Sequence, residues 1–163
     1  MENIFIRLED LLRAQKWKKA DLETQQLLLT ITGREKEKWL REVDVDDYEL
    51  SPENLNTIDD LWLNYSNGRF GFSVQKRIYL EAKCNHKWNC SRWFKYCYKV
   101  GWLYDGLLLK ANWITEEKIK YDISAPEGHL PWIWLNRNFW HANEQTTVTY
   151  PALIMREDLK VTR

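Results

Sequence analysis

The spacing of apolar residues along the chain predicts a protein built mainly of helices. Apolar side chains recur every three or four positions, which places them on one face of a helix. This pattern predicts helices at residues 4–14, 18–32, 34–40 and 88–99. In the last of these, Trp93, Tyr96 and Cys97 share one face, as expected for a helix packed against the rest of the protein.

The stretch Thr57–Tyr79 carries the signals of two helices joined by a tight turn. Thr57 and Asp60 have the spacing of a capping box, so we expect a helix to begin there. Its apolar stripe is formed by Ile58, Leu61, Trp62 and Tyr65. The run from Ser66 to Gly68 tolerates the left-handed backbone that ends a helix, and Ser73 is placed to cap the second helix.

The other segments predict shorter elements and loops. The sequence Ser51-Pro52-Glu53 is typical of a helix start. We expect a loop with a helical turn at residues 42–49, and either a buried turn or a short strand within residues 102–114. An extended segment should follow at residues 115–124. After Pro131 we expect a long mobile loop with strand-forming residues at 146–150, and then a short helix near Ala152–Leu159. Together these elements predict an all-α fold, with residues 1–163 forming a single compact helical domain.

Composition narrows the function classes. The 163 residues suffice for one domain with a real core. Lys and Arg together number 24, as do Asp and Glu, and this zero net charge argues against a nucleic-acid-binding protein and against attachment to acidic membranes. No signal peptide or run of membrane-spanning length is visible. The odd number of cysteines indicates free thiols, so we expect a cytoplasmic protein.

Motifs for catalysis are absent, so we expect a protein that is not an enzyme. The chain has no phosphate-binding loop, dinucleotide fingerprint, nucleophile elbow or paired metalloprotease histidines. Cys84, His86, Cys90 and Cys97 lack the tight pair of a structural zinc site, and we expect no metal bound by the protein itself. His129 could be a ligand to a metal; the reading that we favour is an imidazole that hydrogen-bonds loop backbone and fixes the turn.

Several stretches resemble one known family. Residues 57–79, TIDDLWLNYSNGRFGFSVQKRIY, and residues 125–131, APEGHLP, are similar to the two signatures of the Genomes Uncoupled four tetrapyrrole-binding family, the porphyrin-binding regulators of magnesium chelatase. Further matches in the family's order are Gly33-Arg34-Glu35 with Trp39-Leu40, Val100-Gly101-Trp102 and Trp113. Residues 57–79 are called the first signature below, and residues 125–131 the second signature.

The resemblance implies a cupped, all-helical hand whose apolar palm binds protoporphyrin IX or Mg-protoporphyrin IX, with a linear bilin as a possible alternative. By matched position, the ligand-binding residues would be Leu63, Phe70 and Phe72 on the floor, Trp132 and Trp134 on a flexible finger, and Arg156 against a propionate. Arg69 and Arg137 are weaker candidates for the propionate. From the residues alone, each of these aromatic and apolar side chains could equally be buried core.

The resemblance also implies a function without catalysis. The chain would carry a porphyrin and regulate magnesium chelatase in chlorophyll biosynthesis, as in cyanobacteria, through the large subunit of that enzyme. The alternative is a bilin- or porphyrin-responsive interaction or signalling module unrelated to the chelatase.

Overall fold

The computed structural model describes residues 4–45, 49–84, 89–104, 112–132 and 151–161. Six α-helices are described: α1 (Ile6–Arg13), α2 (Trp17–Ile31), α3 (Glu42–Val45), α4 (Pro52–Tyr65), α5 (Phe72–Glu81) and α6 (Cys90–Lys99). Strands β1 (Leu103–Tyr104) and β2 (Asn112–Trp113), the 3-10 helix η1 (Glu116–Lys118) and a helical turn at residues 151–154 follow. The predicted all-α fold is confirmed, with one two-residue hairpin added.

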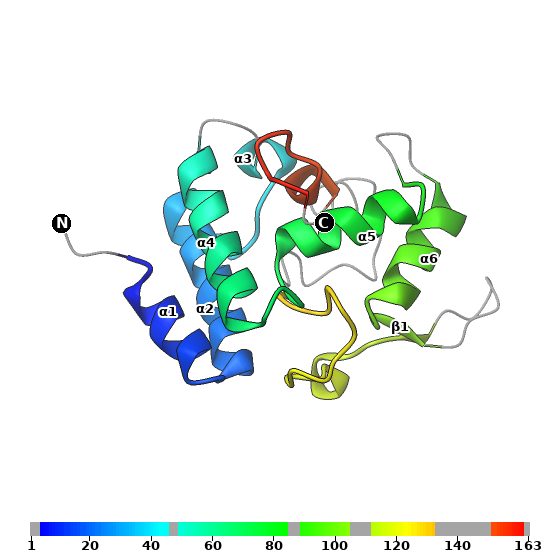
Figure 1. Cartoon of the computed structure of the whole chain (residues 1–163). Coiled ribbons are helices and arrows are strands. Elements are labelled where there is room, and N and C mark those ends of the chain that lie inside the picture. The colour runs from blue at the N-terminus through cyan, green and yellow to red at the C-terminus, as the bar shows by residue number, and fades with distance from the viewer. Residues whose placement is uncertain (1–3, 46–48, 85–88, 105–111, 133–150, 162–163) are drawn as a thin grey trace.

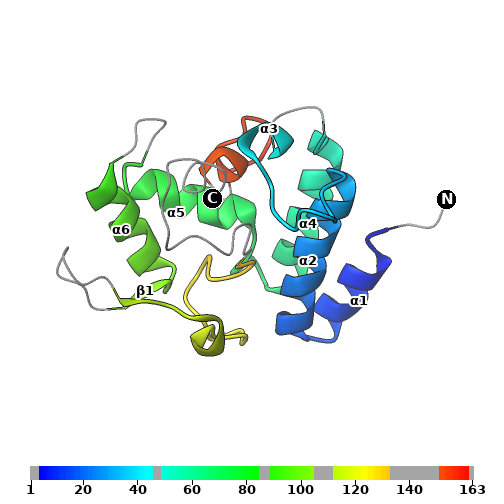
Figure 2. The ribbon, with the colours of Figure 1, turned by 180° about the vertical axis from the view of Figure 1, so that it is seen from behind.

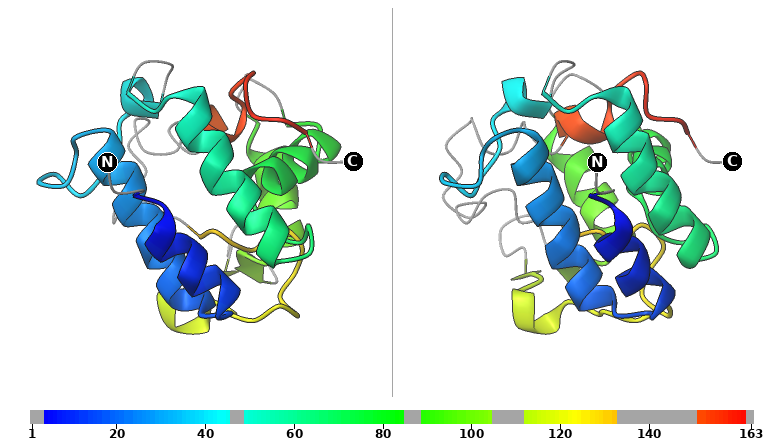
Figure 3. Two further views of the ribbon diagram at one scale, coloured as in Figure 1. Left: turned by 60° about the vertical axis from the view of Figure 1, so that its left-hand side comes forward. Right: turned by 90° about the vertical axis from the view of Figure 1, so that its left-hand side faces the viewer.

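The helices stand in two groups joined by α5. Helix α1 packs against both α2 and α4, and the three form one side of the molecule (Figures 1 and 3). Helix α6 and β1 form the other side, and α5 runs between the two groups (Figures 1 and 2). Strands β1 and β2 are antiparallel, with Leu103 opposite Trp113. The two strands lie within residues 102–114, where a buried turn or a short strand was expected, but the apolar residues 107–109 on which that expectation rested lie outside the described residues.

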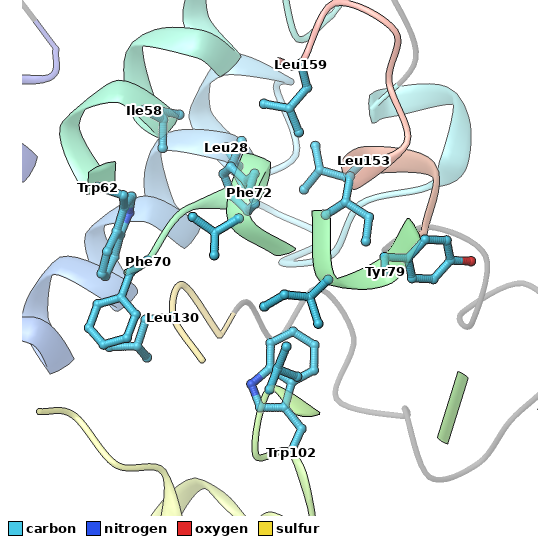
Figure 4. Packing of buried hydrophobic residues seen from close by; sticks show 14 of the residues in the cluster. Leu28, Ile58, Trp62, Phe70, Phe72, Tyr79, Trp102, Leu130, Leu153 and Leu159 are labelled. Carbon is cyan, nitrogen blue, oxygen red and sulfur yellow. The ribbon is translucent and has the colours of Figure 1, made fainter. Parts of the chain in front are cut away.

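The core of the first group is built around aromatic rings. Trp17 stacks on Trp62 with 6.1 Å between the ring centroids, and the edge of Phe70 meets both rings. The indole N–H of Trp62 donates to the Thr24 hydroxyl over 2.9 Å, so this buried donor is satisfied. Figure 4 shows Phe70 and Leu130 beside each other below Trp62. The same layer thus includes a residue of each signature.

A second aromatic group holds α5, α6 and β1 together. Tyr79 from α5 lies edge-on to Trp93 and Tyr96 of α6, and Tyr96 lies edge-on to Trp102 just before β1. All four rings are buried. Cys97 is also buried, so the shared face predicted for this helix is confirmed.

Two predicted helix starts are wrong. Helix α4 begins at Pro52, where the Ser51 hydroxyl accepts the Asn54 amide N–H over 3.2 Å, as the Ser-Pro-Glu sequence indicated. The helix is already formed at Thr57, whose hydroxyl donates to the Glu53 carbonyl instead of capping. Helix α5 begins at Phe72 without a cap from the Ser73 side chain.

Two shorter helices were also predicted wrongly. Residues 35–38 form turns, because the Arg34 guanidinium pairs with Glu37 and Asp44 and lies over the Trp39 ring, which folds this stretch back on itself. The last helix covers residues 151–154 and gives way to turns instead of reaching Leu159. The long loop expected after Pro131, with its strand-forming residues 146–150, lies outside the described residues except for Trp132.

Candidate functional site

The two signatures, far apart in sequence, are hydrogen-bonded to each other through their backbones. The Gly71 N–H donates to the Leu130 carbonyl over 3.1 Å, and the Gly128 N–H donates to the Arg69 carbonyl over 2.8 Å. Because neither segment is part of a sheet, these bonds are local and specific to this junction. The signatures form one structural unit, which we call the junction.

Polar side chains from the first signature satisfy the carbonyl groups of the second signature and of the residues before it. The Arg69 guanidinium donates to the carbonyls of Ile123 and Ala125 over 2.9 and 2.7 Å. The Gln75 amide donates to the carbonyls of Gly128 and Pro131, each over 2.9 Å, and has no exposed surface. Arg69, a weaker candidate for a ligand carboxylate, is thus engaged with backbone.

Two glycines are required where the chain segments meet. Gly71 has φ of 137°, and a Cβ there would lie 2.7 Å from Asp59 Oδ1. That oxygen accepts the Ser73 N–H over 2.9 Å, so a carboxylate on α4 caps α5 in place of the predicted serine. Gly128 has φ of 70°, and its Cβ would lie 2.8 Å from the Ile78 side chain. Burial raises the pKa of Asp59, and hydrogen bonding from Ser73 opposes that rise.

His129 holds the second signature against α6 and η1. Its Nδ1 donates to the Val100 carbonyl over 2.7 Å, and its Nε2 accepts the Lys120 amide N–H over 3.2 Å. The indole of Trp102 donates to the His129 carbonyl over 2.9 Å. These partners define a neutral imidazole, and burial lowers the pKa of His129 in agreement. The predicted role as a backbone-binding residue that fixes the turn is confirmed.

Trp132, the first residue after the second signature, is tied to α2 by a buried carboxyl group. Its backbone N–H donates to Asp21 Oδ1 over 2.5 Å. The Tyr121 hydroxyl lies 3.4 Å from Asp21 Oδ2. Asp21 is only 4% exposed, and this burial raises the pKa of Asp21 to about 8 against the lowering effect of the Trp132 N–H. The carboxyl group therefore stays largely protonated at neutral pH.

The predicted ligand-binding residues lie in different environments. Leu63 on α4 and Trp132 are half-buried. Phe70 and Phe72 are completely buried in the core, and Figure 4 labels both among its packed residues. Trp134 and Arg137 lie outside the described residues.

Arg156, on the C-terminal segment, binds other parts of the protein through its guanidinium group. Its guanidinium donates to the carbonyls of Val45 and Leu50 and forms an ion pair with Asp158 at 2.6 Å. The Lys76 ammonium donates to the carbonyls of Arg156 and Leu159, each over 2.7 Å. In the structure Arg156 thus links the C-terminal segment to residues 45–50.

Buried polar residues that were missed in the sequence include Asp21, Gln75 and Lys76. Asp21 lies three and seven positions before Thr24 and Leu28, on the buried face of α2. A charged residue at a position where the helical period expects an apolar one was therefore the signal for a buried carboxyl group. Its partners lie 100 and 111 positions away, which no local pattern contains.

A metal site is not formed by the described residues, which contain no group of three or more His, Cys, Asp or Glu placed to hold an ion. Cys84 and Cys97 are buried free thiols. His86 and the side chain of Cys90 lie outside the described part of the chain. None of the described helices is long and apolar enough to cross a membrane.

Comparison with known proteins gives a consistent set of relatives. Residues 1–148 match the family described as GUN4-like. A protein of Arabidopsis thaliana named "Tetrapyrrole-binding protein, chloroplastic" is 36% identical over 137 residues, which cover 78% of this chain and 48% of that protein. A Ycf53-like protein of Synechocystis is 32% identical over 130 residues, which cover 78% of this chain and 50% of that protein. The chain spans about half the length of the curated relatives it matches.

Solved structures share the fold over nearly the whole chain. The ligand-free structure of Arabidopsis thaliana GUN4 superposes with a TM-score of 0.76 at 28% identity, covering 99% of this chain and 97% of that one. The structure of GUN4 from Chlamydomonas reinhardtii has a TM-score of 0.72 at 24% identity and covers 94% of this chain and 89% of that one, which shows the common fold. The similarity therefore includes the C-terminal segment that Lys76 and Arg156 hold in place.

Proposed function

Because the chain belongs to the GUN4-like family, we propose that it binds a tetrapyrrole, with protoporphyrin IX or Mg-protoporphyrin IX as the ligand. One observation carries the proposal: the fold matches that of ligand-free Arabidopsis GUN4 along almost its entire length. The name of the Arabidopsis relative supports the class of ligand. The role is binding and delivery, without a catalytic step. The cytoplasmic location expected from the sequence stays a prediction.

We place the ligand against the junction, where half-buried apolar side chains remain available. Leu63 lies next to Gly71, since its side chain is 3.5 Å from the position of a Cβ on that glycine. Trp132 leaves the junction two residues after Leu130, and its backbone is fixed by Asp21. A flat macrocycle needs an apolar floor and an aromatic wall, and these two side chains are of the right kind.

Phe70 and Phe72 enter this proposal as the support beneath the floor. Both rings lack exposed surface, so direct contact with a ligand requires the core around them to open, which for Phe70 means the packing against Trp17 and Trp62. Arg156 would have to leave two backbone carbonyls and Asp158 to meet a propionate. Contact by Arg156 and by Trp134 stays a prediction from the family resemblance.

The energetics allow useful affinity. Burying roughly 300–400 Å² of macrocycle contributes about 8–10 kcal/mol. Lost ligand freedom and the ordering of side chains cost several kcal/mol of that. A remainder of about 5–7 kcal/mol corresponds to a dissociation constant between roughly 10 and 200 μM.

A fluorescence titration tests the proposal. Protoporphyrin IX should quench tryptophan emission saturably, and Trp132→Ala should weaken binding about tenfold, or ~1.4 kcal/mol. Trp39→Ala is the matched control, because Trp39 is 39% exposed and lies over Arg34 in the turn after α2. Absence of saturable quenching in the wild-type protein would refute tetrapyrrole binding. Equal dissociation constants for the two variants would remove Trp132 from the site.

We further propose that the bound porphyrin is delivered to magnesium chelatase, with the large subunit of that enzyme as partner. The support is the resemblance of the two signatures to those of the family and the match of residues 1–148 to the GUN4-like family. A reconstituted chelatase assay at low magnesium tests this step. A faster rate with the chain present is expected. An unchanged rate together with tight porphyrin binding would leave the alternative, a bilin- or porphyrin-responsive interaction module.

A further inference from the structure

A tetrapyrrole with two propionates needs a cation near its acidic edge, and two of the arginines predicted from the sequence, Arg69 and Arg156, are engaged elsewhere. Arg69 donates to the carbonyls of Ile123 and Ala125. Arg156 binds two backbone carbonyls and Asp158. Moving Arg156 to a ligand would leave two buried carbonyl groups without their donor, which is costly, and moving Arg69 would break its two hydrogen bonds to backbone.

Lys18, by contrast, is an exposed cation beside the residues that hold Trp132. It lies in the first turn of α2, three positions before Asp21, so the two side chains emerge from neighbouring turns of one helix face. Its ammonium group is 5.8 Å from the centroid of the Tyr121 ring. The Tyr121 hydroxyl and the Trp132 amide both approach Asp21. None of the ion pairs among the described residues includes Lys18.

We propose that Lys18 binds a carboxylate of the tetrapyrrole at the edge of the site, with Tyr121 holding the ammonium group in place. This inference rests on the proposed tetrapyrrole binding and names the residue that recognises the acidic edge of the ligand. The Tyr121 ring attracts the cation and limits the positions that it samples. A restrained ammonium loses less conformational freedom when it meets an anion.

The charge state of Asp21 makes this arrangement effective. An ionised carboxylate one helical turn away would offset the positive charge of Lys18. Burial raises the pKa of Asp21 to about 8, so its carboxyl group is mostly protonated at neutral pH. Glu116 on η1 is the acidic residue whose field acts on both Asp21 and Tyr121, but it is exposed and its charge is screened by water. Lys18 therefore keeps most of its attraction for an anion.

The test compares protoporphyrin IX with its dimethyl ester, which has the same ring and no carboxylates. Lys18→Gln should raise the dissociation constant of the diacid about fivefold, equivalent to ~1 kcal/mol, and leave that of the ester unchanged. Lys18→Arg, which keeps the charge, should restore most of the affinity for the diacid. Lys19→Gln is the matched control, because Lys19 is also an exposed lysine in the first turn of α2, and it should change neither constant. The dissociation constants are measured from tryptophan quenching at low and at high salt.

The outcomes separate this inference from the proposal on which it rests. Wild-type protein that binds the diacid more tightly than the ester, with the difference lost in Lys18→Gln and reduced by salt, supports Lys18. Equal binding of the diacid by Lys18→Gln and the wild-type protein would overturn the role of Lys18 while leaving tetrapyrrole binding intact. An equal loss for acid and ester would show that the aliphatic stem matters instead of the charge. Failure of the wild-type protein to bind either porphyrin would overturn both proposals.

Discussion

Replacing Gly71 by alanine is expected to destabilise the protein by about 2–4 kcal/mol, because two costs add. The first is conformational: φ of 137° with ψ of 161° is a backbone region open essentially to glycine alone, and holding another residue there costs about 1–3 kcal/mol. The second is steric. The new Cβ would lie 2.7 Å from Asp59 Oδ1, so the carboxylate must move.

Moving Asp59 removes the cap of α5. Its Oδ1 accepts the Ser73 N–H over 2.9 Å, and losing such a cap typically costs about 1 kcal/mol. The two costs can be separated by a double-mutant cycle. In an Asp59→Ala background the cap is already absent and the clash is relieved, so Gly71→Ala should cost about 1 kcal/mol less than it does in the wild-type protein.

The assay is urea unfolding followed by far-ultraviolet circular dichroism, with the four proteins of the cycle compared at one pH. Gly68→Ala is the control for a positive φ without a clash, because φ there is 75° and no atom lies within 4 Å of the added Cβ; it should cost about 1 kcal/mol. A Gly71→Ala penalty no larger than that of Gly68→Ala, or an identical penalty in the Asp59→Ala background, would refute this account of the junction.

Three further predictions concern buried polar groups. The folded protein retains a proton on Asp21 up to a pH of about 8, whereas the unfolded chain loses it near 3.8, so stability should fall as pH rises between these values, by up to ~1.4 kcal/mol per pH unit. Asp21→Asn, neutral at every pH, should remove that slope in urea unfolding at pH 5 to 8; an unchanged slope would show that Asp21 is ionised. Burial lowers the pKa of His129 below 6.5, so the wild-type protein should lose stability as pH drops below that value and His129→Asn should show a smaller loss; equal losses would contradict the neutral imidazole. Lys76→Met removes a buried donor from the carbonyls of Arg156 and Leu159, of which the Arg156 carbonyl keeps the Leu159 N–H as a donor. This change should cost about 1–3 kcal/mol and speed proteolysis at the C-terminal end, whereas Lys95→Met on the exposed face of α6 should cost less than ~0.5 kcal/mol.

The helices were predictable because their signals are local. The apolar stripes of α1, α2 and α6 lie within single stretches of sequence, and the Ser-Pro-Glu start of α4 needs no distant partner. The errors arose where a distant residue decided the structure. Ser73 was predicted to cap α5, but Asp59, 14 positions earlier, accepts its amide. Residues 34–40 fail to form a helix because Asp44 draws Arg34 away.

The site was less predictable for the same reason. The sequence pattern around an aromatic residue in a turn is the same whether the ring faces a ligand or the core. Phe72 could therefore be placed at the junction, but its complete burial could not be predicted. Asp21, which holds Trp132, is distinguished in the sequence only by its phase with the apolar face of α2. The resemblance identified the two stretches that meet, and the hydrogen bonds between Gly71 and Leu130 and between Gly128 and Arg69 account for their pairing.

The central claim is that a tetrapyrrole binds beside the junction, and an NMR titration of ¹⁵N-labelled protein with protoporphyrin IX tests it most directly. The ring current of a bound porphyrin shifts amide signals strongly and only at short range. The largest shifts are predicted at Leu63, at Leu130 and Trp132, and in the first turns of α2 around Lys18 and Asp21. Saturable binding whose shifts are confined to α3, or the absence of shifts at millimolar ligand, would contradict the account.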